Sequence, residues 1–329
     1  MVFTGQPGYE ELVERELRPH GLVVQERGAG WVRTDGPAPA NPDWCFPHRA
    51  IHAPREITGT SVNALAAGVA ELFLESMRGE RIEQPWAYLV LGASGLDGLG
   101  RRAAAVDSAV RDLLKRRMAR VARLASDATP ARGEGRGLAL FFADFGRIFV
   151  SRDFWSGGQQ RMADDPAAPS RSYLKVEEAY QVLGREPASG ETVVDLGAAP
   201  GGWSFSAAKR GARVIAVDNG PLKGGALDHP QIEHRREDAY RFRPEAGTVV
   251  DWLFCDMVDD PHDVVRAIVE PWVAQRMCRH FVVNLKFGRA DALAVLDEAR
   301  RRLGPRCATL VVRHLFHDRE ELTLVGDVA

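Results

Sequence analysis

The sequence lacks long hydrophobic runs. Nowhere among its 329 residues do about 18 apolar residues follow one another, which is the length that a membrane-spanning helix needs. The first residues, MVFTGQPGYEEL, already contain two glutamates and no apolar core, so they do not resemble a secretory signal peptide. Both absences predict a cytoplasmic protein that makes no contact with a membrane.

Cysteine is scarce, and the four cysteines are far apart in the chain. Cys45, Cys255, Cys278 and Cys307 form no C-x-x-C pair. Zinc sites and disulfide frameworks both need cysteines at short, regular spacing. No group of His, Cys and Asp residues has ligand spacing either. We therefore expect free thiols in a reducing compartment and no bound metal.

A strong excess of charge of one sign is also missing. The chain has 43 Lys and Arg against 45 Asp and Glu, a net charge of −2, which by itself argues against a nucleic-acid partner. Net charge, however, averages over all faces of a protein. Residues 101–123 contain eight Lys or Arg and only two Asp. This basic stripe could bind phosphate groups or could be the solvated face of a helix, and the pattern alone leaves both interpretations open.

The length of the chain predicts two domains. Residues 161–171 (RMADDPAAPSR) have no apolar periodicity, so we interpret them as a linker between a domain over 1–160 and a domain over 172–329. The first domain is expected to be an α/β lobe. Its expected elements are a strand at the start, a helix over 8–17, a hairpin over 21–35, helices over 61–77 and 101–124, and strands over 86–92 and 137–150.

In the second domain, strand-like apolar runs alternate with amphipathic stretches. The runs cover 192–198, 213–218, 231–237, 249–256, 280–286, 308–316 and 321–326, and the expected helices cover 172–184, 202–210, 262–277 and 290–303. Strands separated by crossover helices predict a mostly parallel seven-stranded sheet covered on both faces, which is a Rossmann-like α/β fold. Only four residues join the last two runs, so we expect a hairpin that adds an antiparallel strand at the sheet edge.

A glycine-rich loop, DLGAAPGGW, follows the first of these strands and extends from Asp195 to Trp203. Open α/β sheets bind ligands at this position, beyond the carboxyl ends of their strands. Its glycines allow a tight turn and the close approach of a ligand. The G-x-G-x-x-G fingerprint of dinucleotide-binding folds is absent, because Ala199 stands at the second glycine position. The loop therefore indicates an adenosine-type cofactor but does not favour NAD.

Each of the next three strands ends at an aspartate. Asp218 could accept both ribose hydroxyls of an adenosine, Asp238 could meet the adenine amino group, and Asp256 could face a methionine ammonium group or the substrate. One acidic residue at a strand end usually only caps a turn. A series of them after a glycine-rich loop favours S-adenosylmethionine as the cofactor.

Two lysines and two acids stand at matching positions near this edge of the sheet. Lys286 follows the apolar run FVVNL, Asp256 ends the preceding strand, Lys175 lies in SRSYLKVEEA and Glu321 lies in HDREELTLV. A lysine can act as a general base if burial and neighbouring cations lower its pKa. We interpret these four residues as the candidate catalytic set, with Lys286 as the candidate base.

Together these motifs resemble those of the FtsJ-type RNA ribose 2′-O-methyltransferases. The matching strings are PSRSYLKVEEAY, VVDLGAAPGGWS, VDNGPL, REDAYRFRP, FCDMV, FVVNLKF and LFHDREELTL, in the family's order over residues 169–326. Upstream, QPGYEELVEREL is similar to the start of the RNA-binding region in members that methylate a cytidine of bacterial 23S ribosomal RNA. In those members this region contains a THUMP domain, so the resemblance implies a THUMP-like N-terminal region here.

The resemblance also implies a Lys-Asp-Lys-Glu tetrad of Lys175, Asp256, Lys286 and Glu321. Lys286 would accept the proton of the ribose hydroxyl, Lys175 and Asp256 would orient that hydroxyl and tune the base, and Glu321 would complete the network. Glu321 is preferred to Glu320 because it directly precedes the apolar alternation of the last strand. The expected contacts of S-adenosylmethionine are Ser172, Asp195, Gly197, Ala199, Pro200, Gly201, Gly202, Trp203, Asp218, Asp238 and Asp256.

The partner that the resemblance implies is RNA, namely 23S ribosomal RNA or a precursor of the large ribosomal subunit. One alternative is another RNA such as tRNA, because specificity would depend on the N-terminal region and on RNA shape. The other is a non-catalytic RNA-binding protein on a methyltransferase scaffold, because a fold alone does not imply a function. The presence of all four tetrad residues argues against that last alternative.

Overall fold

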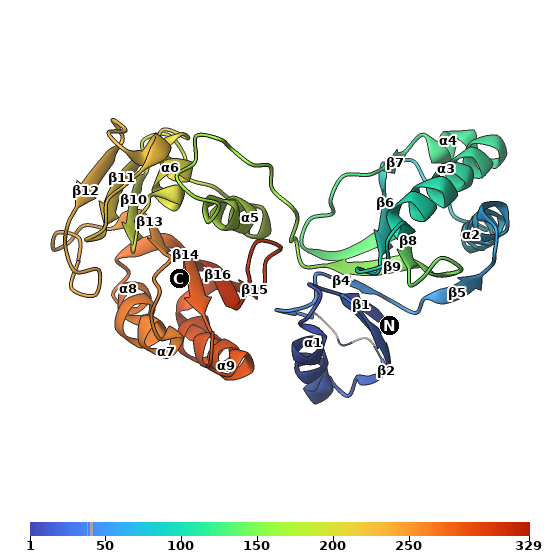
Figure 1. The fold of residues 1–329 in the computed structure, drawn as a ribbon, viewed down its shortest axis with the longest axis horizontal. Coiled ribbons are helices and arrows are strands. Elements are labelled where there is room, and N and C mark those ends of the chain that lie inside the picture. The colour runs from blue at the N-terminus through green and yellow to red at the C-terminus, as the bar shows by residue number, and fades with distance from the viewer. Residues whose placement is uncertain (38, 40–41) are drawn as a thin grey trace. The chain divides into compact units, whose positions relative to one another are not determined.

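The computed structural model describes residues 1–37, 39 and 42–329, and the chain forms two compact units, Met1–Gly158 and Gln159–Ala329 (Figure 1). The segment expected to be a linker, 161–171, contains no helix or strand and belongs to the second unit. It is tied to that unit by hydrogen bonds. The Met162 backbone N–H donates to His317 Nε2 at 2.9 Å, and the Ala167 carbonyl accepts from Gly225 N–H at 2.9 Å.

The N-terminal unit is built on one mixed sheet, nine-stranded in the described part of the chain. The order is β2-β3-β1-β4-β9-β8-β6-β7, and β5 also pairs with β9. The strands are β1 Val2–Thr4, β2 Val23–Gly28, β3 Trp31–Asp35, β4 Arg49–Ile51, β5 Arg55–Thr58, β6 Trp86–Gly92, β7 Ala125–Ser126, β8 Gly133–Phe142 and β9 Arg147–Ser156. The expected single strand over 137–150 is wrong, because β8 and β9 form an antiparallel hairpin there. Its turn is stabilised by Asp144, whose carboxylate accepts from Gly146 N–H at 2.7 Å.

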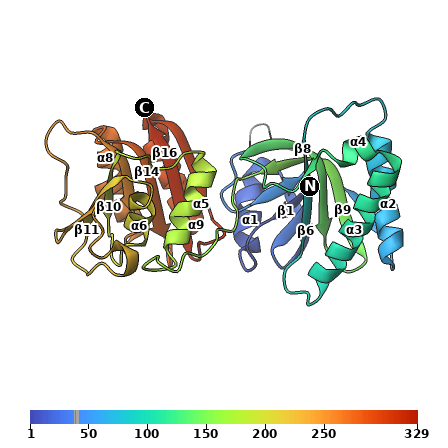
Figure 2. The same cartoon turned by 90° about the horizontal axis from the view of Figure 1, so that it is seen from above.

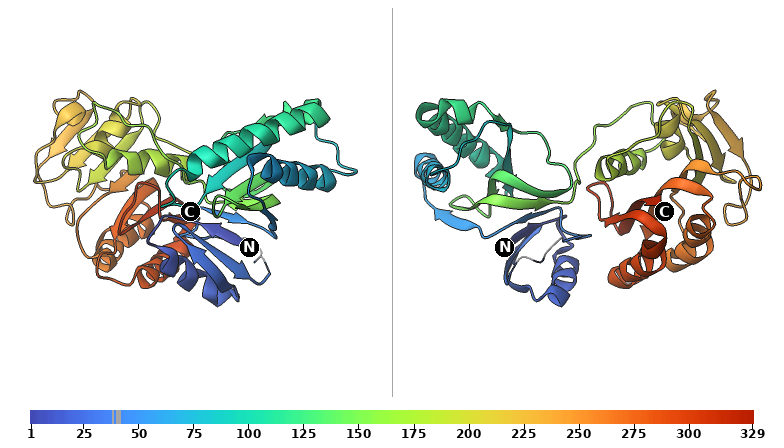
Figure 3. Two further views of the ribbon diagram at one scale, coloured as in Figure 1. Left: turned by 45° about the vertical axis from the view of Figure 1, so that its right-hand side comes forward. Right: turned by 180° about the vertical axis from the view of Figure 1, so that it is seen from behind.

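The helices of this unit are α1 Glu10–Leu17, α2 Val62–Ser76, α3 Leu99–Arg117 and α4 Ala119–Ala122. Helix α2 begins after Ser61, whose hydroxyl accepts from Ala64 N–H at 3.1 Å. Helices α2 and α3 lie side by side on one face of the sheet (Figures 2 and 3). Their apolar faces form one core with β6, β8 and β9, and a second core lies around Trp31, Phe141 and Phe149.

The C-terminal unit contains a seven-stranded sheet in the order β12-β11-β10-β13-β14-β16-β15. Its strands are β10 Thr192–Leu196, β11 Arg213–Val217, β12 Ile232–Arg235, β13 Val250–Cys255, β14 Cys278–Lys286, β15 Cys307–Arg313 and β16 Glu321–Val328. Strands β10 to β14 pair in parallel, whereas β16 is antiparallel to both of its neighbours. The expected antiparallel strand is therefore present, but it lies between β14 and β15, and the expectation that it forms the edge is wrong. The predominantly apolar β16 is more deeply buried than β15, which fits an interior position.

The helices of the C-terminal unit cover both faces of its sheet. They are α5 Tyr173–Leu183, α6 Gly202–Ala208, α7 Pro261–Asp263, α8 Glu270–Ala274 and α9 Ala292–Leu303, and a π-helical segment over Val264–Val269 joins α7 to α8. Figure 1 shows α5 and α6 on one face and α7, α8 and α9 on the other. The carboxyl ends of the five parallel strands consequently meet at one edge, which is where the functional candidates follow in the sequence.

The close pairing of β6 and β8 gives a test of the N-terminal unit. A Cβ atom at Gly137 would overlap the carbonyl oxygen of Ala87 on β6, whereas a Cβ at Gly100 on α3 would meet nothing within 4 Å. We predict that Gly137→Ala lowers the free energy of unfolding by about 1–3 kcal/mol because the strands must separate. Gly100→Ala should instead raise it by about 0.4–1 kcal/mol. Calorimetric unfolding of the full chain checks both values, and equal midpoints for the two variants would contradict this packing.

Candidate active site

The glycine-rich loop connects β10 to α6. Gly197 and Gly201 have φ values of 76° and 107°, in the left-handed region that favours glycine. A Cβ atom at Gly197 would lie 2.6 Å from Met257 Cγ, so the loop packs closely against the segment that follows β13. Ala199 and Pro200 are half-buried. The loop therefore presents backbone to the carboxyl edge of the sheet, as the spacing of its glycines predicts.

Two expected cofactor contacts in this loop have buried side chains. Asp195 is 0% exposed and accepts a hydrogen bond from Ser204 Oγ at 2.6 Å, and burial raises its pKa to about 7. Trp203 is 2% exposed, and its Nε1 donates to the carbonyl of Ser172 at 2.9 Å. Both side chains support the loop from within the unit and offer little surface to a ligand.

The other expected contacts surround the loop at the same sheet edge. Asp218, after β11, accepts from Ala199 N–H at 2.9 Å and from Gly220 N–H at 2.7 Å. Asp238 follows β12 and is exposed. Ser172 precedes α5, and its hydroxyl would lie 3.1 Å from a Cβ atom at Gly202. Asp218 and Ser172 thus lie beside the loop, and Asp238 lies beyond the end of β12 at the same edge of the sheet.

Lys286 and Asp256 form an ion pair across neighbouring strands. Lys286 is the last residue of β14, and Asp256 follows β13 directly. Lys286 Nζ donates to Asp256 Oδ1 at 2.6 Å and to the carbonyl oxygens of Asp256 and Met257, both at 3.1 Å. The two side chains are 22% and 15% exposed, so the amine is held in one position but remains accessible.

Lys175 and Glu321 form a second ion pair beside the first. Lys175 Nζ lies 2.7 Å from Glu321 Oε2, with both side chains mostly buried. Glu321 begins β16 and stands directly opposite Lys286 in the β14–β16 pairing. The neighbouring Glu320 is exposed, in agreement with the preference for Glu321. The structure therefore brings all four members of the expected tetrad together from α5, β13, β14 and β16.

The charge environment of Lys175 differs from the expectation for a lysine base. Burial by itself lowers the pKa of Lys175, but the carboxylates of Asp256, Asp318 and Glu321 raise it, and the net effect is a pKa above the ordinary value. Lys175 is therefore a permanent cation at neutral pH. It can orient oxygen atoms but is unsuited to accept a proton.

Asp318 is a member of this network that the sequence patterns did not reveal. It is 2% exposed and accepts hydrogen bonds from Asn284 Nδ2 at 3.1 Å and from Thr323 Oγ1 at 2.9 Å. Asn284 and Thr323 are cross-strand partners, and they lie two residues before Lys286 in β14 and two residues after Glu321 in β16. Burial raises the pKa of Asp318 to about 7. The sequence contains little indication of this role, because Asp318 lies in a short connection, where an aspartate usually only stabilises the turn.

Within residues 1–37, 39 and 42–329, no group of three or more His, Cys, Asp or Glu side chains is placed to hold a metal ion. In the same residues, no helix is both long enough and apolar enough to cross a membrane.

Comparisons with known proteins identify the family of the chain. The family model of the FtsJ-like methyltransferases matches residues 168–284. The ribosomal RNA large subunit methyltransferase M of Laribacter hongkongensis is 33% identical over 97% of this chain and 94% of its own length. The protein of the same name from Azotobacter vinelandii is 32% identical over 97% of this chain and 95% of its own. The chain belongs to the ribosomal RNA large subunit methyltransferase M family. It is thus an S-adenosylmethionine-dependent methyltransferase.

Two further matches cover little more than half of the chain. The family member from Halorhodospira halophila is 42% identical over 57% of each chain. Among solved structures, the fibrillarin/Nop5p complex includes a chain that is 13% identical, with a TM-score of 0.41, over 54% of this chain and 94% of that one. The assignment to the methyltransferase M family therefore rests on the full-length relatives.

Glu178 connects this site to the start of the unit. It is 0% exposed on α5, and its carboxylate accepts from the backbone N–H groups of Gln160 at 3.1 Å, Phe316 at 3.0 Å and His317 at 3.2 Å. These bonds hold the segment before α5 against the connection that precedes Glu321. Burial nevertheless raises the pKa of Glu178 to about 8.

This raised pKa predicts a pH-dependent stability. Because folding favours the protonated Glu178, its contribution is fully present below the unfolded pKa of about 4.5 and is lost as pH rises through about 8. Glu178→Gln should unfold at a lower temperature at pH 5, since one backbone donor loses its acceptor at a cost of about 1–3 kcal/mol. Its melting temperature should then fall less steeply between pH 5 and pH 9 than that of the wild type.

The matched control for this experiment is Glu237→Gln, which changes an exposed glutamate of the same unit. The control should reproduce the wild-type pH profile. Parallel profiles of Glu178→Gln and the wild type would show that Glu178 does not titrate in this range.

Proposed function

We propose that this protein methylates the 2′-hydroxyl of a ribose in large-subunit ribosomal RNA, at a cytidine of 23S ribosomal RNA. The observation that carries the proposal is the fixed position of Lys286 Nζ, which is held at 2.6 Å by Asp256 beside the glycine-rich loop. The names of the full-length relatives support ribosomal RNA as the substrate. The four cysteines, all of them among the described residues, form no disulfide, which suits a cytoplasmic enzyme.

The residues around the loop fit S-adenosylmethionine by their chemistry. Asp218 would accept the ribose hydroxyls, Asp238 would accept from the adenine amino group, and Asp256 would face the methionine ammonium group. Backbone atoms of Ala199 to Gly202 would line the remaining surface. When bound, the cofactor supplies an electrophilic methyl group on a positively charged sulfur.

The tetrad residues would handle the proton and the orientation of the acceptor. A ribose hydroxyl is a weak acid, so a base must take its proton as the oxygen attacks. Lys286 is the candidate base because it is accessible and reaches the carboxyl edge of the sheet. Lys175, a permanent cation, would bind the ribose oxygen, while Asp256 and Glu321 hold the two amines apart in fixed positions.

The N-terminal unit would bind and select the RNA. This role for residues 1–158, and a THUMP-like character of the region, are part of the proposal. Support comes from the basic end of α3, where Lys115, Arg116 and Arg117 follow one another. Because sequence-specific RNA recognition relies on shape and unpaired bases, a unit that folds separately from the catalytic one is suited to it.

Two substitutions of Lys286 test the base. Lys286→Ala removes the amine, and Lys286→Arg keeps a positive charge but cannot release a proton near neutral pH. We predict that both variants lose methyl transfer by a factor of roughly 100–10,000, the range typical of a lost general base. Both should bind S-adenosylmethionine within about threefold of the wild type, which calorimetry would measure. Activity of Lys286→Arg near the wild-type level would exclude Lys286 as the base.

The substrate is tested by incubating the protein with labelled S-adenosylmethionine and unmodified RNA. Total ribosomal RNA and total tRNA are supplied separately, and the label is mapped by digestion to nucleosides and by primer extension. We expect 2′-O-methylcytidine in 23S ribosomal RNA. Label in tRNA or on a base would overturn the proposed substrate, and absence of cofactor binding would favour a non-catalytic scaffold.

A further inference from the structure

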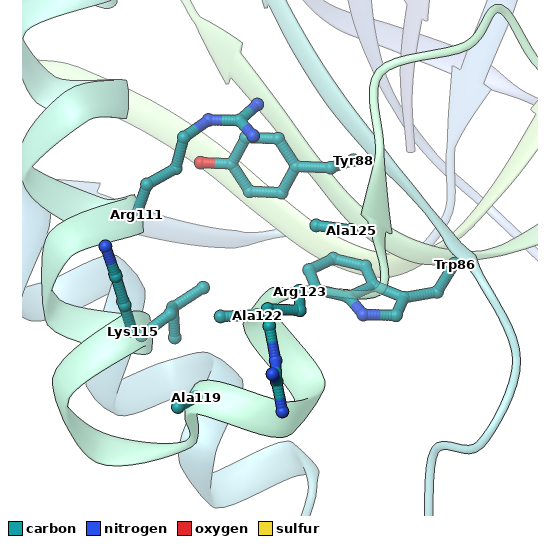
Figure 4. A pocket seen from close by; sticks show the side chains of 9 residues that line it. Trp86, Tyr88, Arg111, Lys115, Ala119, Ala122, Arg123 and Ala125 are labelled. Atoms are coloured by element: carbon teal, nitrogen blue, oxygen red, sulfur yellow. The ribbon is translucent and has the colours of Figure 1, made fainter.

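The N-terminal unit contains a pocket of about 560 Å³ between the start of β6, the end of α3 and helix α4 (Figure 4). Trp86 and Tyr88 line one side, and small side chains of α4 line another. Three cations, Arg111, Lys115 and Arg123, complete the lining. A volume of this size matches those of small-ligand sites. None of the tetrad residues or the glycine-rich loop takes part in it.

The aromatic side of the pocket is rigid. The Trp86 ring stacks on Phe73 with a centroid distance of 5.1 Å, and its Nε1 donates to the carbonyl of Val121 at 2.9 Å. The guanidinium of Arg111 lies 4.2 Å from the centre of the Tyr88 ring. Ordering these side chains therefore costs nothing further when a ligand binds.

The Tyr88 hydroxyl makes no well-formed hydrogen bond in this wall. Tyr88 is 3% exposed, and burial and the nearby Asp107 carboxylate raise the pKa of its hydroxyl, but no acceptor among the described residues lies in ordinary hydrogen-bond geometry to Oη. Buried polar atoms are rarely left unpaired, so a group of this kind next to a pocket indicates capacity to bond a ligand. A nucleobase edge carries the donors and acceptors that such a hydroxyl can use.

The three cations of the pocket fall into two kinds. Arg111 is already paired with Asp107 at 2.9 Å and with Asp127 at 2.5 Å, so its charge is compensated. Lys115 and Arg123 are exposed, and neither has a carboxylate partner among the described residues. Elsewhere on the basic stripe, Arg117 pairs with Glu71 and Arg120 with Glu83. Uncompensated positive charge is therefore present where the pocket lies.

We propose that this pocket holds one unpaired nucleotide of the RNA substrate, with its base against Trp86 and Tyr88 and its phosphates on Lys115 and Arg123. The inference rests on the proposed function, because it takes RNA as the partner. Aromatic surface next to free cations is the combination that binds single-stranded RNA, since stacking serves the base and the cations serve the backbone. It also assigns the basic stripe a specific role at one of its ends.

Charge removal at the pocket provides the first test. The double variant Lys115→Ala/Arg123→Ala is compared with Arg78→Ala/Arg101→Ala, which removes two exposed cations of the same unit that do not line the pocket. The probe is a fluorescent single-stranded 12-nucleotide RNA of mixed sequence, titrated into the full chain at several salt concentrations. We expect the pocket variant to bind about tenfold more weakly, with a salt slope reduced by about 1.4. The matched variant should stay within about twofold of the wild type.

Filling the pocket separates base binding from electrostatics. Ala119 lines the pocket and is exposed, so Ala119→Trp adds bulk there without changing charge. We expect the Ala119→Trp variant to bind the same single-stranded RNA about tenfold more weakly than the wild type. The variant and the wild type should bind a blunt RNA duplex equally. In parallel, RNA carrying 4-thiouridine should cross-link to peptides that contain Trp86 or residues 119–125.

These outcomes decide the proposal independently of methyl transfer. Equal weakening by both double variants, or cross-links confined to other segments, would overturn it. An RNA affinity of Ala119→Trp equal to that of the wild type would also overturn the proposal. An acidic or apolar peptide would then be the candidate ligand of the pocket. If the protein fails to methylate ribosomal RNA but still cross-links through this pocket, the proposed function fails and the binding site stands.

Discussion

Two ammonium groups are held among three carboxylates at the carboxyl edge of the C-terminal sheet, and the remaining structure serves to maintain that arrangement. Lys286 lies against Asp256, and Lys175 lies against Glu321, with Asp318 buried nearby. Charges this poorly hydrated are tolerated only when each is paired and hydrogen-bonded. Removing any one partner would leave another charge uncompensated, so the members of this network depend on one another.

The sheet topology makes this network possible. Strand β16 enters between β14 and β15 in the antiparallel direction, which places Glu321 directly opposite Lys286. A strand at the outer edge would have separated those two side chains by the width of another strand. The same insertion buries Asn284 and Thr323 as a polar pair that holds Asp318. Through Asp318, the short connection between β15 and β16 is therefore part of the site.

The two units differ in their surfaces as well as in their folds. The C-terminal unit concentrates acidic groups around its glycine-rich loop, which suits a cofactor with hydroxyl, amino and ammonium groups. The N-terminal unit instead combines a rigid aromatic wall with the uncompensated cations Lys115 and Arg123. On the proposed roles, substitutions can alter methyl transfer and RNA binding separately, because the residues proposed for the two do not overlap.

The local features of this protein were predictable from its amino-acid sequence alone. Alternating apolar runs and amphipathic stretches predicted the parallel strands and helices of the C-terminal unit, and the motif at Asp195 to Trp203 predicted the loop. Lys175, Asp256, Lys286 and Glu321 were identifiable because each adjoins the start or end of a regular element or lies in a motif. These patterns depend only on residues that are close together in the chain, so they can be recognised in the sequence without the structure.

The position of β16, the hairpin of β8 and β9, and the burial of Asp195 and Trp203 became known from the three-dimensional structure. This structure also brought Asp318 to the lysines and closed a pocket around Trp86. Each of these depends on pairing or packing between residues far apart in the chain. Hydrophobic periodicity predicts that a strand forms, but it does not specify which strands are its neighbours in the sheet. A short connection such as the one that contains Asp318 has no hydrophobic periodicity, so its position cannot be predicted in this way.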